Sequence, residues 1–514
     1  MKNIFILTPL CILFITSAAH AQTYTGIYDP DDWRTVTNHS YVTVIASEIN
    51  YVYFATTGGI LIYDEIKEEW RDFWLPKQIV RIGVGPFRLY LEIRPEHIDV
   101  GELPYIQFDK KNFEWKYDYK PASYEEITWF GGDYDVTRLE NQFPFVHDID
   151  FMDKYLRHNR IISWQTDHFG EFLWIGSDGG GLYKYEINTG WFEKIRFGLL
   201  DPHVSSILKS GGIFWFGGVG EKREDYRGVT IYDPGQESYR YMETRYIKKF
   251  PTATVRDIAE SRYDVWLATP QGLVRFNKER HGWQSFDTFS GLSGDDVVSV
   301  ATTKDYVWVG LRTGLDWMRV DKKGEVKERG EVPHKLSYLT INDLESHEDM
   351  VVAATGDGAF SYTLGDTGWV MLDAGALPLV GQIDQVCIDK DHIYFAVEEG
   401  VIDYDRSLEK WDMHYFFTNI PETGSRNPPC IRAIAADRFN LWLGTDNGIW
   451  RLNKKRGLWH KYLPLPAQNK SSLVSSVTLP DKTINDIAID GNYIWFATKF
   501  GVTRFYWNDP NRTW

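Results

Sequence analysis

LWLGTDNGIWRLNKKRGLWHKY, residues 441–462, is the stretch that decides the fold. Its first apolar run, Leu441 to Leu443, ends in a small residue and a turn made of Asp446, Asn447 and Gly448. Asp, Asn and Gly tolerate the positive φ values that tight hairpins require. A second apolar run, a charged turn and an aromatic pair follow. The stretch therefore predicts three consecutive strands joined by two turns.

The same pattern recurs along the chain as nine windows of nine residues that close on a glycine, which comes late, at Gly228, in the third window. The windows are YVYFATTGG (51–59), FLWIGSDGG (172–180), IFWFGGVGE (213–221), DVWLATPQG (264–272), YVWVGLRTG (306–314), MVVAATGDG (350–358), HIYFAVEEG (392–400), NLWLGTDNG (440–448) and YIWFATKFG (493–501). From the fourth window onward they repeat about every 40–50 residues, the period of a β-propeller blade.

Each repeat contains the parts of a four-stranded blade. A strand signal with small residues precedes the window by about ten residues, as in residues 255–259 and 484–488, and would form the innermost strand. The window itself is a nearly continuous apolar run, which indicates a strand buried on both faces between blades. A third strand and a fourth with an aromatic pair, such as Trp459 and Tyr462, complete the unit. The chain is therefore predicted to be an all-β propeller of about ten four-stranded blades.

The repeat does not determine the number of rings. It also leaves an irregular region, about residues 79–160, where the windows are not regular. Residues 79–83, 89–91, 105–108 and 113–117 are interpreted as one diverged blade. Residues 124–158 contain ITWFGG (127–132) and form either a partial blade or an insert. Propellers have four to eight blades as a rule, which favours two smaller rings. However, no Gly/Ser/Pro linker divides the chain, so a single large ring is the alternative interpretation.

The N-terminal residues 26–36 resemble the end of a blade, since GIYDPDDWRTV is similar to VTIYDP at residues 229–234. The repeats at the other end stop at Trp514, where a fourth strand would begin. We therefore expect the N-terminal strand to complete the last blade and to remove an exposed sheet edge.

Residues 1–21 have the features of a secretory signal peptide: Lys2, a short apolar run and a small-x-small ending at Ala21. The apolar run is too short to span a bilayer, and residues 8–10 before Cys11 are a poor lipobox. No later stretch predicts a transmembrane helix. We expect residues 22–514 to be a soluble propeller, periplasmic or secreted. The net charge of −16 argues against nucleic acid as a partner.

The repeat resembles a known family, the two-component-regulator propeller repeat. The matching residues are Gly198-Leu199-Leu200 before Val204, Gly291-Leu292-Ser293 before Val297, and the windows ending at Gly180, Gly272 and Gly448. The resemblance implies the propeller fold. It also implies a relation to the periplasmic sensors of hybrid histidine kinases, which are associated with recognition of carbohydrate fragments. No kinase or receiver segment follows the propeller here, so the sensor role does not transfer directly.

Candidate binding residues lie in the turns between the second and third strands, where the repeats differ from one another. Charged side chains around a ring opening can hydrogen-bond a polar ligand, whereas the alternative is that they are solvated turn residues. The candidates are Asp178, Arg312, Asp357, Glu398, Asp446 and Lys499, together with the longer loop 217–227.

Tryptophan at the third window position is interpreted as interblade core, because it repeats at one blade position. These residues are Trp174, Trp215, Trp266, Trp308, Trp442 and Trp495. Trp164, Trp317 and Trp450 break the pattern and are better candidates for a surface role, although packing is the favoured role for them as well. Cys387 and Cys430 are expected either to pair, as export permits, or, by preference, to pack as two buried thiols.

Neither a cofactor nor a metal ion is predicted. His147, Asp148, Asp150 and Asp153 concentrate acidic groups beside a histidine, but no glycine-punctuated calcium loop accompanies them. The common hydrolase and metalloprotease motifs are absent from the sequence, and the histidines are scattered. The preferred hypothesis is an exported, non-catalytic propeller that binds an envelope protein or a glycan through one face. A polysaccharide hydrolase or lyase, and a detached sensor that works with a separate membrane kinase, are the alternatives.

Overall fold

A computed structural model describes most of the chain. The described residues are 32–75, 78–94, 105–111, 114–117, 121, 125–131, 136–148, 158–220, 227–321, 325–332, 334–373, 375, 381–398, 400–415, 429–462 and 479–508. In this part the strands form ten antiparallel sheets, nine of four strands and one of five. The prediction of an all-β propeller with about ten blades is confirmed.

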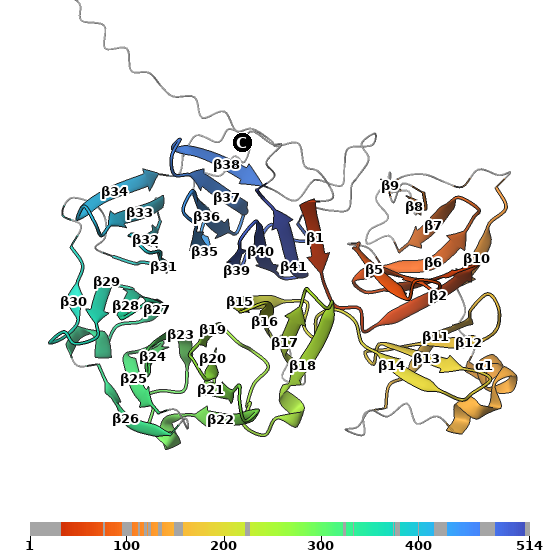
Figure 1. The fold of residues 1–514 in the computed structure, drawn as a ribbon, viewed down its shortest axis with the longest axis horizontal. Coiled ribbons are helices and arrows are strands. Elements are labelled where there is room, and N and C mark those ends of the chain that lie inside the picture. The colour runs from red at the N-terminus through yellow and green to blue at the C-terminus, as the bar shows by residue number, and fades with distance from the viewer. Residues whose placement is uncertain are drawn as a thin grey trace, which may run out of the picture.

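Seven sheets form a closed ring, on the left in Figure 1. They are β15–β18 (Val204–Ser210, Ile213–Gly218, Gly228–Asp233, Ser238–Glu243), β19–β22 (Asp257–Glu260, Asp264–Thr269, Gly272–Asn277, Gly282–Phe286), β23–β26 (Val297–Thr303, Tyr306–Leu311, Leu315–Val320, Val326–Glu331), β27–β30 (Ile341–His347, Met350–Thr355, Gly358–Thr363, Val370–Met371), β31–β34 (Gln385–Ile388, His392–Val397, Gly400–Asp405, Lys410–Tyr415), β35–β38 (Ile431–Ala436, Asn440–Thr445, Gly448–Asn453, Leu458–Tyr462) and β39–β41 (Asp486–Asp490, Tyr493–Thr498, Gly501–Tyr506) with β1 (Trp33–Val36). The first strand of each blade contacts the first strand of the next, and β39 contacts β15.

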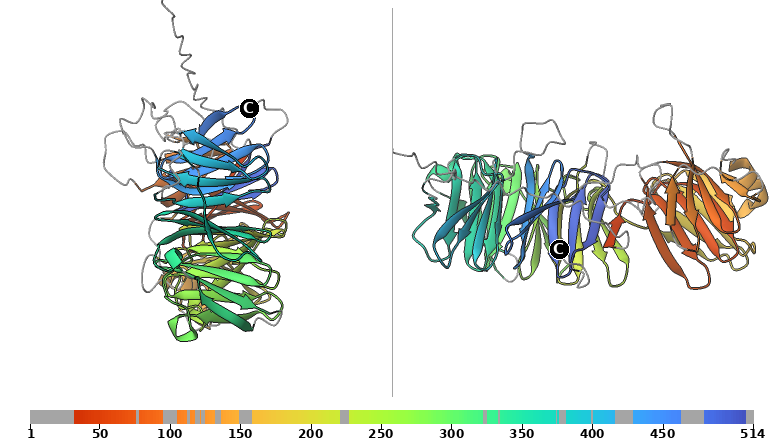
Figure 2. Two further views of the ribbon diagram at one scale, coloured as in Figure 1. Left: turned by 90° about the vertical axis from the view of Figure 1, so that its left-hand side faces the viewer. Right: turned by 90° about the horizontal axis from the view of Figure 1, so that it is seen from above.

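The other three sheets form a separate unit, which we call the three-blade unit. It consists of β2–β5 (Val42–Glu48, Tyr51–Thr56, Gly59–Asp64, Glu69–Trp74), β6–β10 (Ile79–Val84, Arg88–Ile93, Tyr105–Asp109, Glu114–Tyr117, Thr128–Gly131) and β11–β14 (Ile161–Thr166, Phe172–Ser177, Leu182–Glu186, Phe192–Ile195). The strand β2 lies between β6 and β11, since it contacts both. The unit lies beside the ring, as Figure 2 shows from above. The ten blades therefore do not form one large ring.

The irregular region forms one five-stranded blade and a helical cover. The four segments that the sequence predicted as one diverged blade form one sheet, and the ITWFGG segment adds β10 to it, paired with β6, rather than starting another blade. Helix α1 (Val136–Gln142) and the 3-10 helix Pro144–Asp148 follow. Leu139 packs with Leu173, Ile175 and Tyr183 of the blade β11–β14, so these helices cover the apolar face of that blade.

The N-terminal strand closes the ring, as predicted. β1 pairs antiparallel with β41, so that Trp33 lies opposite Phe505 and Val36 opposite Val502. The chain then leaves the ring at residues 37–41, builds the three-blade unit, and returns through residues 196–203 to β15. Closure in this way places strands from both ends of the chain in one sheet and gives the last blade of the ring its fourth strand.

The turn between the second and third strands explains the repeated threonine and glycine. In the opening stretch, Thr445 Oγ1 donates to the carbonyl of Gly448 (2.9 Å) and accepts from the Asn447 N–H (3.0 Å). The glycine that follows has positive φ, as at Gly272 (+112°), where a Cβ would lie 2.3 Å from the Phe286 carbonyl oxygen. Only glycine fits there without displacing the backbone of the fourth strand.

The core lies between neighbouring blades, and tryptophan fills it. The six tryptophans at the third window position are at most 4% exposed, so the prediction that they form interblade core is confirmed. Trp450 is 4% exposed as well, within the core between the blades β31–β34 and β35–β38, so the favoured packing role is confirmed for it and the alternative surface role is not. Trp164 and Trp317 are half-buried and pack at the edge of core clusters.

Both described cysteines are free thiols. Cys387 lies on β31 and packs against the next blade, whereas Cys430 is exposed just before β35. The expectation of two buried thiols therefore holds in part for Cys387, which is half-buried, and is wrong for Cys430. Burial raises the pKa of the Cys387 thiol, and the neighbouring carboxyl of Glu345 raises it further, so this thiol is a poor nucleophile.

Candidate functional site

The axis of the ring is a polar channel lined by the first strands of its blades, with a cavity of about 610 Å³. Its wall carries carboxyl groups that the sequence analysis did not nominate: Asp257, Asp343, Glu345 and Asp486. Three of them follow one pattern, an apolar residue, any residue, aspartate and an apolar residue, at the same position of β19, β27 and β39.

Each of the three aspartates is hydrogen-bonded to the backbone of the next blade. Asp257 Oδ2 accepts from the Val300 N–H (2.8 Å), Asp343 Oδ2 from the Val386 N–H (2.9 Å), and Asp486 Oδ2 from the Ile207 N–H (2.6 Å). The other oxygen of each carboxyl accepts from the N–H of the following residue in its own strand. Both oxygens of each side chain are thus engaged, which indicates a structural role.

Crowding of these acids in the channel favours their protonated forms. Burial raises the pKa of Asp343 to about 7, and the nearby charge of Asp257 adds to the effect. Burial likewise raises the pKa of Asp486 to about 7. Ser299 Oγ lies 2.6 Å from Asp257 Oδ2 and 3.2 Å from Asp343 Oδ1, so it links the first two carboxyls across three blades.

Glu345 differs from the aspartates because it makes no bond to the neighbouring blade. It lines the channel two residues after Asp343, at a position that Ala259, Ala301, Ala435 and Ala488 occupy in other blades. Burial, together with the nearby charge of Asp343, raises its pKa to about 8. Its Oε1 accepts only from the N–H of Ser346 at 3.2 Å among its described hydrogen bonds. Glu345 is therefore the channel carboxyl that is most available to a ligand.

These raised pKa values predict a contribution to stability that is lost as the pH rises. Groups whose folded pKa lies above the unfolded value bind more protons when folded, so their contribution to the free energy of unfolding decreases between about pH 4 and pH 8. Glu345→Gln removes the contribution with the highest pKa. We expect the variant to be more stable than the wild type by on the order of 1 kcal/mol at about pH 8 and little changed at about pH 5.

Urea unfolding at several pH values measures this difference. The matched control is Glu279→Gln, an exposed glutamate on the β21–β22 turn, which should leave the pH profile unchanged. A Glu345→Gln profile parallel to that of the wild type would show that Glu345 is charged in the folded protein at neutral pH.

The turns between second and third strands lie on one face of the ring, which we call the turn face. The first strands, which line the channel, begin at this face, because each runs antiparallel to the second strand of its blade. The loops that lead from each fourth strand into the next blade lie there too. They are hydrogen-bonded to the turns, since Gly272 N–H donates to the Asp295 carbonyl and Gly314 N–H to the Leu339 carbonyl.

Five of the six predicted binding residues lie on the turn face of the ring. Arg312, Asp357, Glu398, Asp446 and Lys499 belong to five successive blades, and all five are exposed. No described hydrogen bond or ion pair joins any of them to another of the five. Asp446 Oδ1 instead accepts from the Cys430 N–H at 3.2 Å. This bond supports the alternative that Asp446 has a structural role in its turn.

Arg312 is connected to the rim of the channel through Asp296. Arg312 Nε donates to Asp296 Oδ2 (2.6 Å), and the same carboxyl pairs with Arg256, which lines the channel. Burial alone would raise the pKa of Asp296, but the two arginines outweigh it and hold the pKa below its ordinary value. Arg432, at the position equivalent to Arg256 in β35, lines the channel and is exposed. The rim is thus cationic above an acidic channel wall.

Asp178 lies apart from the other five, on the β12–β13 turn of the three-blade unit. Its Oδ1 accepts from the Arg160 N–H (2.7 Å), and its Oδ2 pairs with the Arg160 guanidinium (3.3 Å). It borders a second cavity, between the three-blade unit and the ring. Only the ends of the candidate loop 217–227 are described, and its Arg227 borders the same cavity.

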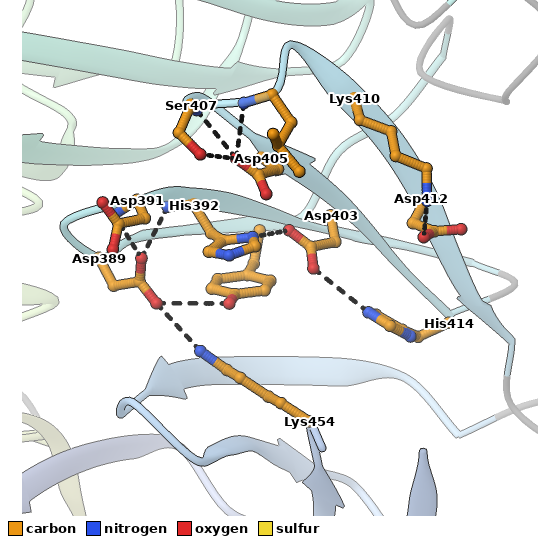
Figure 3. Close-up of polar contacts among 12 residues, drawn as sticks. Asp389, Asp391, His392, Asp403, Asp405, Ser407, Lys410, Asp412, His414 and Lys454 are labelled. Atoms are coloured by element: carbon orange, nitrogen blue, oxygen red, sulfur yellow. Dashed lines mark hydrogen bonds and ion pairs between the residues drawn. The ribbon is translucent and has the colours of Figure 1, made fainter. Parts of the chain in front are cut away.

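Two histidines that looked scattered in the sequence meet at one carboxyl group (Figure 3). His392 Nδ1 lies 2.7 Å from Asp403 Oδ1, and His414 Nε2 lies 3.4 Å from Asp403 Oδ2. The ring of His392 stacks on Tyr394, which lies in the interface with the next blade, where Lys454 pairs with Asp389 (3.0 Å). This network lines none of the cavities described above, and it connects two blades.

Within the described residues, no group of three or more His, Cys, Asp or Glu side chains is arranged to hold a metal ion. The acidic segment weighed as a cation site, His147 to Asp153, falls outside the residues whose side chains are described. None of the helices in the described part is long and apolar enough to cross a membrane.

No family model matches the sequence, and no curated protein matches it. Among solved structures, the chain is similar to PorZ, described as a surface component of the type IX secretion system of Porphyromonas gingivalis. The identity is 11%, with 90% of this chain and 74% of that chain covered and a TM-score of 0.48.

Two further solved structures share about three fifths of the chain. Virginiamycin B lyase from Staphylococcus aureus is 16% identical, with 60% of this chain and 95% of that chain covered and a TM-score of 0.43. The WD40 repeats of RRP9 are 12% identical, with 59% and 94% covered and a TM-score of 0.44. At these values the similarities carry no argument about activity.

Proposed function

We propose that the protein is an exported, non-catalytic propeller of the two-component-regulator repeat type, which binds a protein or carbohydrate ligand through the turn face of its ring. The observation that carries the proposal is the turn-face end of the channel, where the strands that line it begin. Exposed side chains of both charges lie on successive blades at this face, and one of them, Arg312, is linked through Asp296 to Arg256 on the channel wall. Convergent polar groups around a concave opening are typical of ligand sites.

Two exposed aromatic residues on the same face support this proposal. Phe289 is 99% exposed in the loop between β22 and β23, and Tyr338 is 83% exposed in the loop between β26 and β27. Both loops lead into first strands at the turn face. Exposure of a large aromatic side chain to water is unfavourable, and such side chains are enriched where proteins bind partners.

Hydrolysis or elimination of a polysaccharide, the alternative, finds less support in the channel. A glycosidase needs two carboxyl groups that reach the substrate. Asp257, Asp343 and Asp486 use both carboxyl oxygens on backbone N–H groups. Glu260, which also lines the channel, pairs with Lys278 and accepts from Ser210 Oγ (2.6 Å). This leaves Glu345 as the channel carboxyl without a side-chain partner among the described residues. The hydrogen bonding of these acids therefore favours the binding hypothesis.

The test is retention of ligands by the immobilised mature protein from a panel of bacterial surface glycans and an envelope extract. We expect Phe289→Ala with Arg312→Ala to weaken retention by about tenfold or more, since each hot-spot side chain contributes more than about 1 kcal/mol. The matched control is Phe439→Ala with Arg262→Ala, an exposed aromatic residue and an exposed arginine on the opposite face. Equal retention by both double variants would contradict the proposal.

A further inference from the structure

Two blades of the three-blade unit enclose a groove of about 770 Å³, which we call the acidic groove. The blade β2–β5 contributes residues at its β4–β5 turn, and the blade β11–β14 contributes residues of β13, β14 and the turn between them. None of the residues that line the groove belongs to the ring, so the groove is separate from the turn face. The lining residues that matter below are Tyr63, Glu68, Lys184, Glu186, Trp191 and Glu193.

The strand register places four of these side chains on one face of the blade β11–β14. Lys184 lies opposite Glu193 of β14, and the Glu186 N–H donates to the Trp191 carbonyl (2.8 Å), which continues the same pairing by one step. Residues opposite each other, and residues two apart in one strand, share a face of a sheet. Trp174 lies opposite Lys184 on this face, within the interface with the blade β2–β5. The four side chains therefore face the neighbouring blade.

The aromatic wall of the groove already holds one ammonium group. Lys184 Nζ lies 4.1 Å from the centre of the Phe172 ring, 5.0 Å from that of Tyr63 and 5.1 Å from that of Trp174. Trp191 is 49% exposed, and no ring stack or cation–π contact involves its ring among the described residues. Tryptophan is the aromatic side chain that attracts cations most strongly. Trp191 is thus an aromatic face that a cation from outside the chain can reach.

Carboxylates outnumber cations in the groove. Among the residues that line it, Lys184 is the only cation, whereas Glu68, Glu186 and Glu193 are acidic. Glu68 and Glu193 are exposed, and no hydrogen bond or ion pair joins either side chain to another described residue. The Glu186 carboxylate accepts from Thr189 Oγ1 (2.7 Å), a neutral partner that leaves its charge in place. The charge of Lys184 therefore offsets only part of the negative charge.

The basic residues next to the groove do not cancel this excess. Residues 64–69, DEIKEE, contain four acidic residues and a single cation, Lys67. Lys194 follows Glu193 in β14 and lies on the other face of the sheet, with its Nζ 5.4 Å from the centre of the Tyr183 ring. The surroundings of the groove are thus acidic as well.

Carboxylates of both blades lie close to one hydroxyl group, that of Tyr63. Burial, together with the charges of Glu68, Glu65 and Glu193, raises the pKa of this hydroxyl to about 12. Glu65 and Glu68 belong to the β4–β5 turn, whereas Glu193 belongs to β14. A cation in the groove would therefore be attracted by acidic groups from two sides.

We propose that the acidic groove binds a basic segment of a partner protein, with a lysine or arginine side chain on the Trp191 ring and its charge beside Glu68 and Glu193. Charge complementarity selects this occupant, since the groove combines excess carboxylates with an exposed aromatic face. The net charge of −16 argues against a second copy of the chain. The proposal does not depend on the function proposed for the ring.

Fluorescence anisotropy of the full mature protein tests the groove with three labelled probes of similar length. They are a capped peptide of alternating lysine and glycine, the same peptide with glutamate in place of lysine, and cellohexaose. We expect the lysine peptide to bind, with an affinity that decreases as salt is added, because salt screens exposed charges. The glutamate peptide and cellohexaose should not bind at the same concentrations.

Two changes in the groove should weaken binding of the lysine peptide. Trp191→Ala should weaken it by about fivefold, as expected for loss of a cation–π contact. Glu68→Gln with Glu193→Gln should weaken it by about tenfold and reduce its dependence on salt. The matched control is Glu279→Gln with Glu409→Gln, which removes the same charge from exposed turns of the ring and should bind as the wild type does. Trp191→Phe keeps an aromatic face and should recover part of the affinity.

Four results would each overturn the proposal. They are no binding of the lysine peptide, unchanged binding by Trp191→Ala, equal weakening by the two double glutamine variants, and tighter binding of cellohexaose than of the lysine peptide. Equal weakening would mean that the peptide is attracted by the acidic chain as a whole, and preference for cellohexaose that the groove binds a neutral glycan. Retention of a ligand at the turn face of the ring is measured separately and is unaffected by any of these results.

Discussion

Trp33→Ala is expected to destabilise the protein by about 3–5 kcal/mol, the cost of removing a large aromatic side chain from a packed core. Trp33 is 5% exposed and stacks on Phe505, with ring centres 4.0 Å apart. It also contacts Tyr462 of the preceding blade at 6.1 Å. Loss of this side chain removes the main anchor of β1, which is the strand that closes the ring. Urea unfolding followed by tryptophan fluorescence and circular dichroism measures the change.

Trp191→Ala is the matched control, because Trp191 is 49% exposed in the three-blade unit. It should shift the unfolding midpoint only slightly. A Trp33→Ala variant as stable as Trp191→Ala would mean that β1 does not hold the last blade. Deletion of the residues before Val42 would then also be tolerated, contrary to the observed pairing with β41.

Arg34→Met is expected to cost about 3 kcal/mol or more, because it leaves a buried carboxylate without its cation. Arg34 joins the two units: its Nη2 lies 3.0 Å from Asp72 Oδ1 on β5, and its Nη1 lies 2.7 Å from Glu237 Oε1 on the ring. The Asp72 side chain is 2% exposed, and its other oxygen has no hydrogen-bond partner among the described residues. We expect the junction to loosen, so that limited proteolysis cleaves the crossing segments faster.

The double variant Arg34→Met with Asp72→Asn separates the ion pair from the packing. It should recover much of the lost stability, since a neutral amide no longer needs a cation. Glu237→Gln, which removes an exposed partner (46% exposed), should have an effect below about 1 kcal/mol. If Arg34→Met is as stable as Glu237→Gln, then Asp72 does not depend on Arg34, and the units are held by other contacts.

The fold could be predicted because each blade is specified locally. The apolar window, the Thr-x-x-Gly turn and the aromatic fourth strand each recur at one blade position, and the structure places all of them as expected. The closing role of Trp33 to Val36 was also predictable, since the segment has the pattern of a blade end without its blade. These signals depend on short-range geometry, which the sequence displays directly.

The division into seven blades and three could not be predicted in the same way. It depends on which first strands touch, and contacts such as that between β15 and β39 join residues far apart in the chain. The crossing segments 37–41 and 196–203 are not rich in Gly, Ser or Pro. They are held by specific bonds, as where Asn38 Nδ2 donates to the Leu199 carbonyl (2.6 Å). For this reason no linker composition marked the boundary.

The face on which the candidate residues lie could be predicted from the sequence, whereas the carboxyl groups of the channel were not predicted. Five of the six turn residues lie on one face of the ring, as a propeller requires. The channel acids were not predicted, because the prediction rested on the turns, where the repeats differ most. A usable signal was present: aspartate at the same position in three first strands, at Asp257, Asp343 and Asp486. A charged residue on the innermost strand of a propeller faces the axis, so its recurrence indicates either a clamp between blades or a site. Trp450 lies outside the repeated tryptophan position and is nevertheless core, as the favoured packing role predicted.

Hydrogen–deuterium exchange of the mature protein with and without a retained ligand tests most directly that the ring binds through its turn face. We expect ligand to protect from exchange the loops that lead into β23 and β27, which contain Phe289 and Tyr338, and the turn that contains Arg312. Protection should be absent from the opposite-face turns that contain Arg262 and Phe439. Protection confined to the opposite face, or to the outer strands β22 and β26, would contradict it.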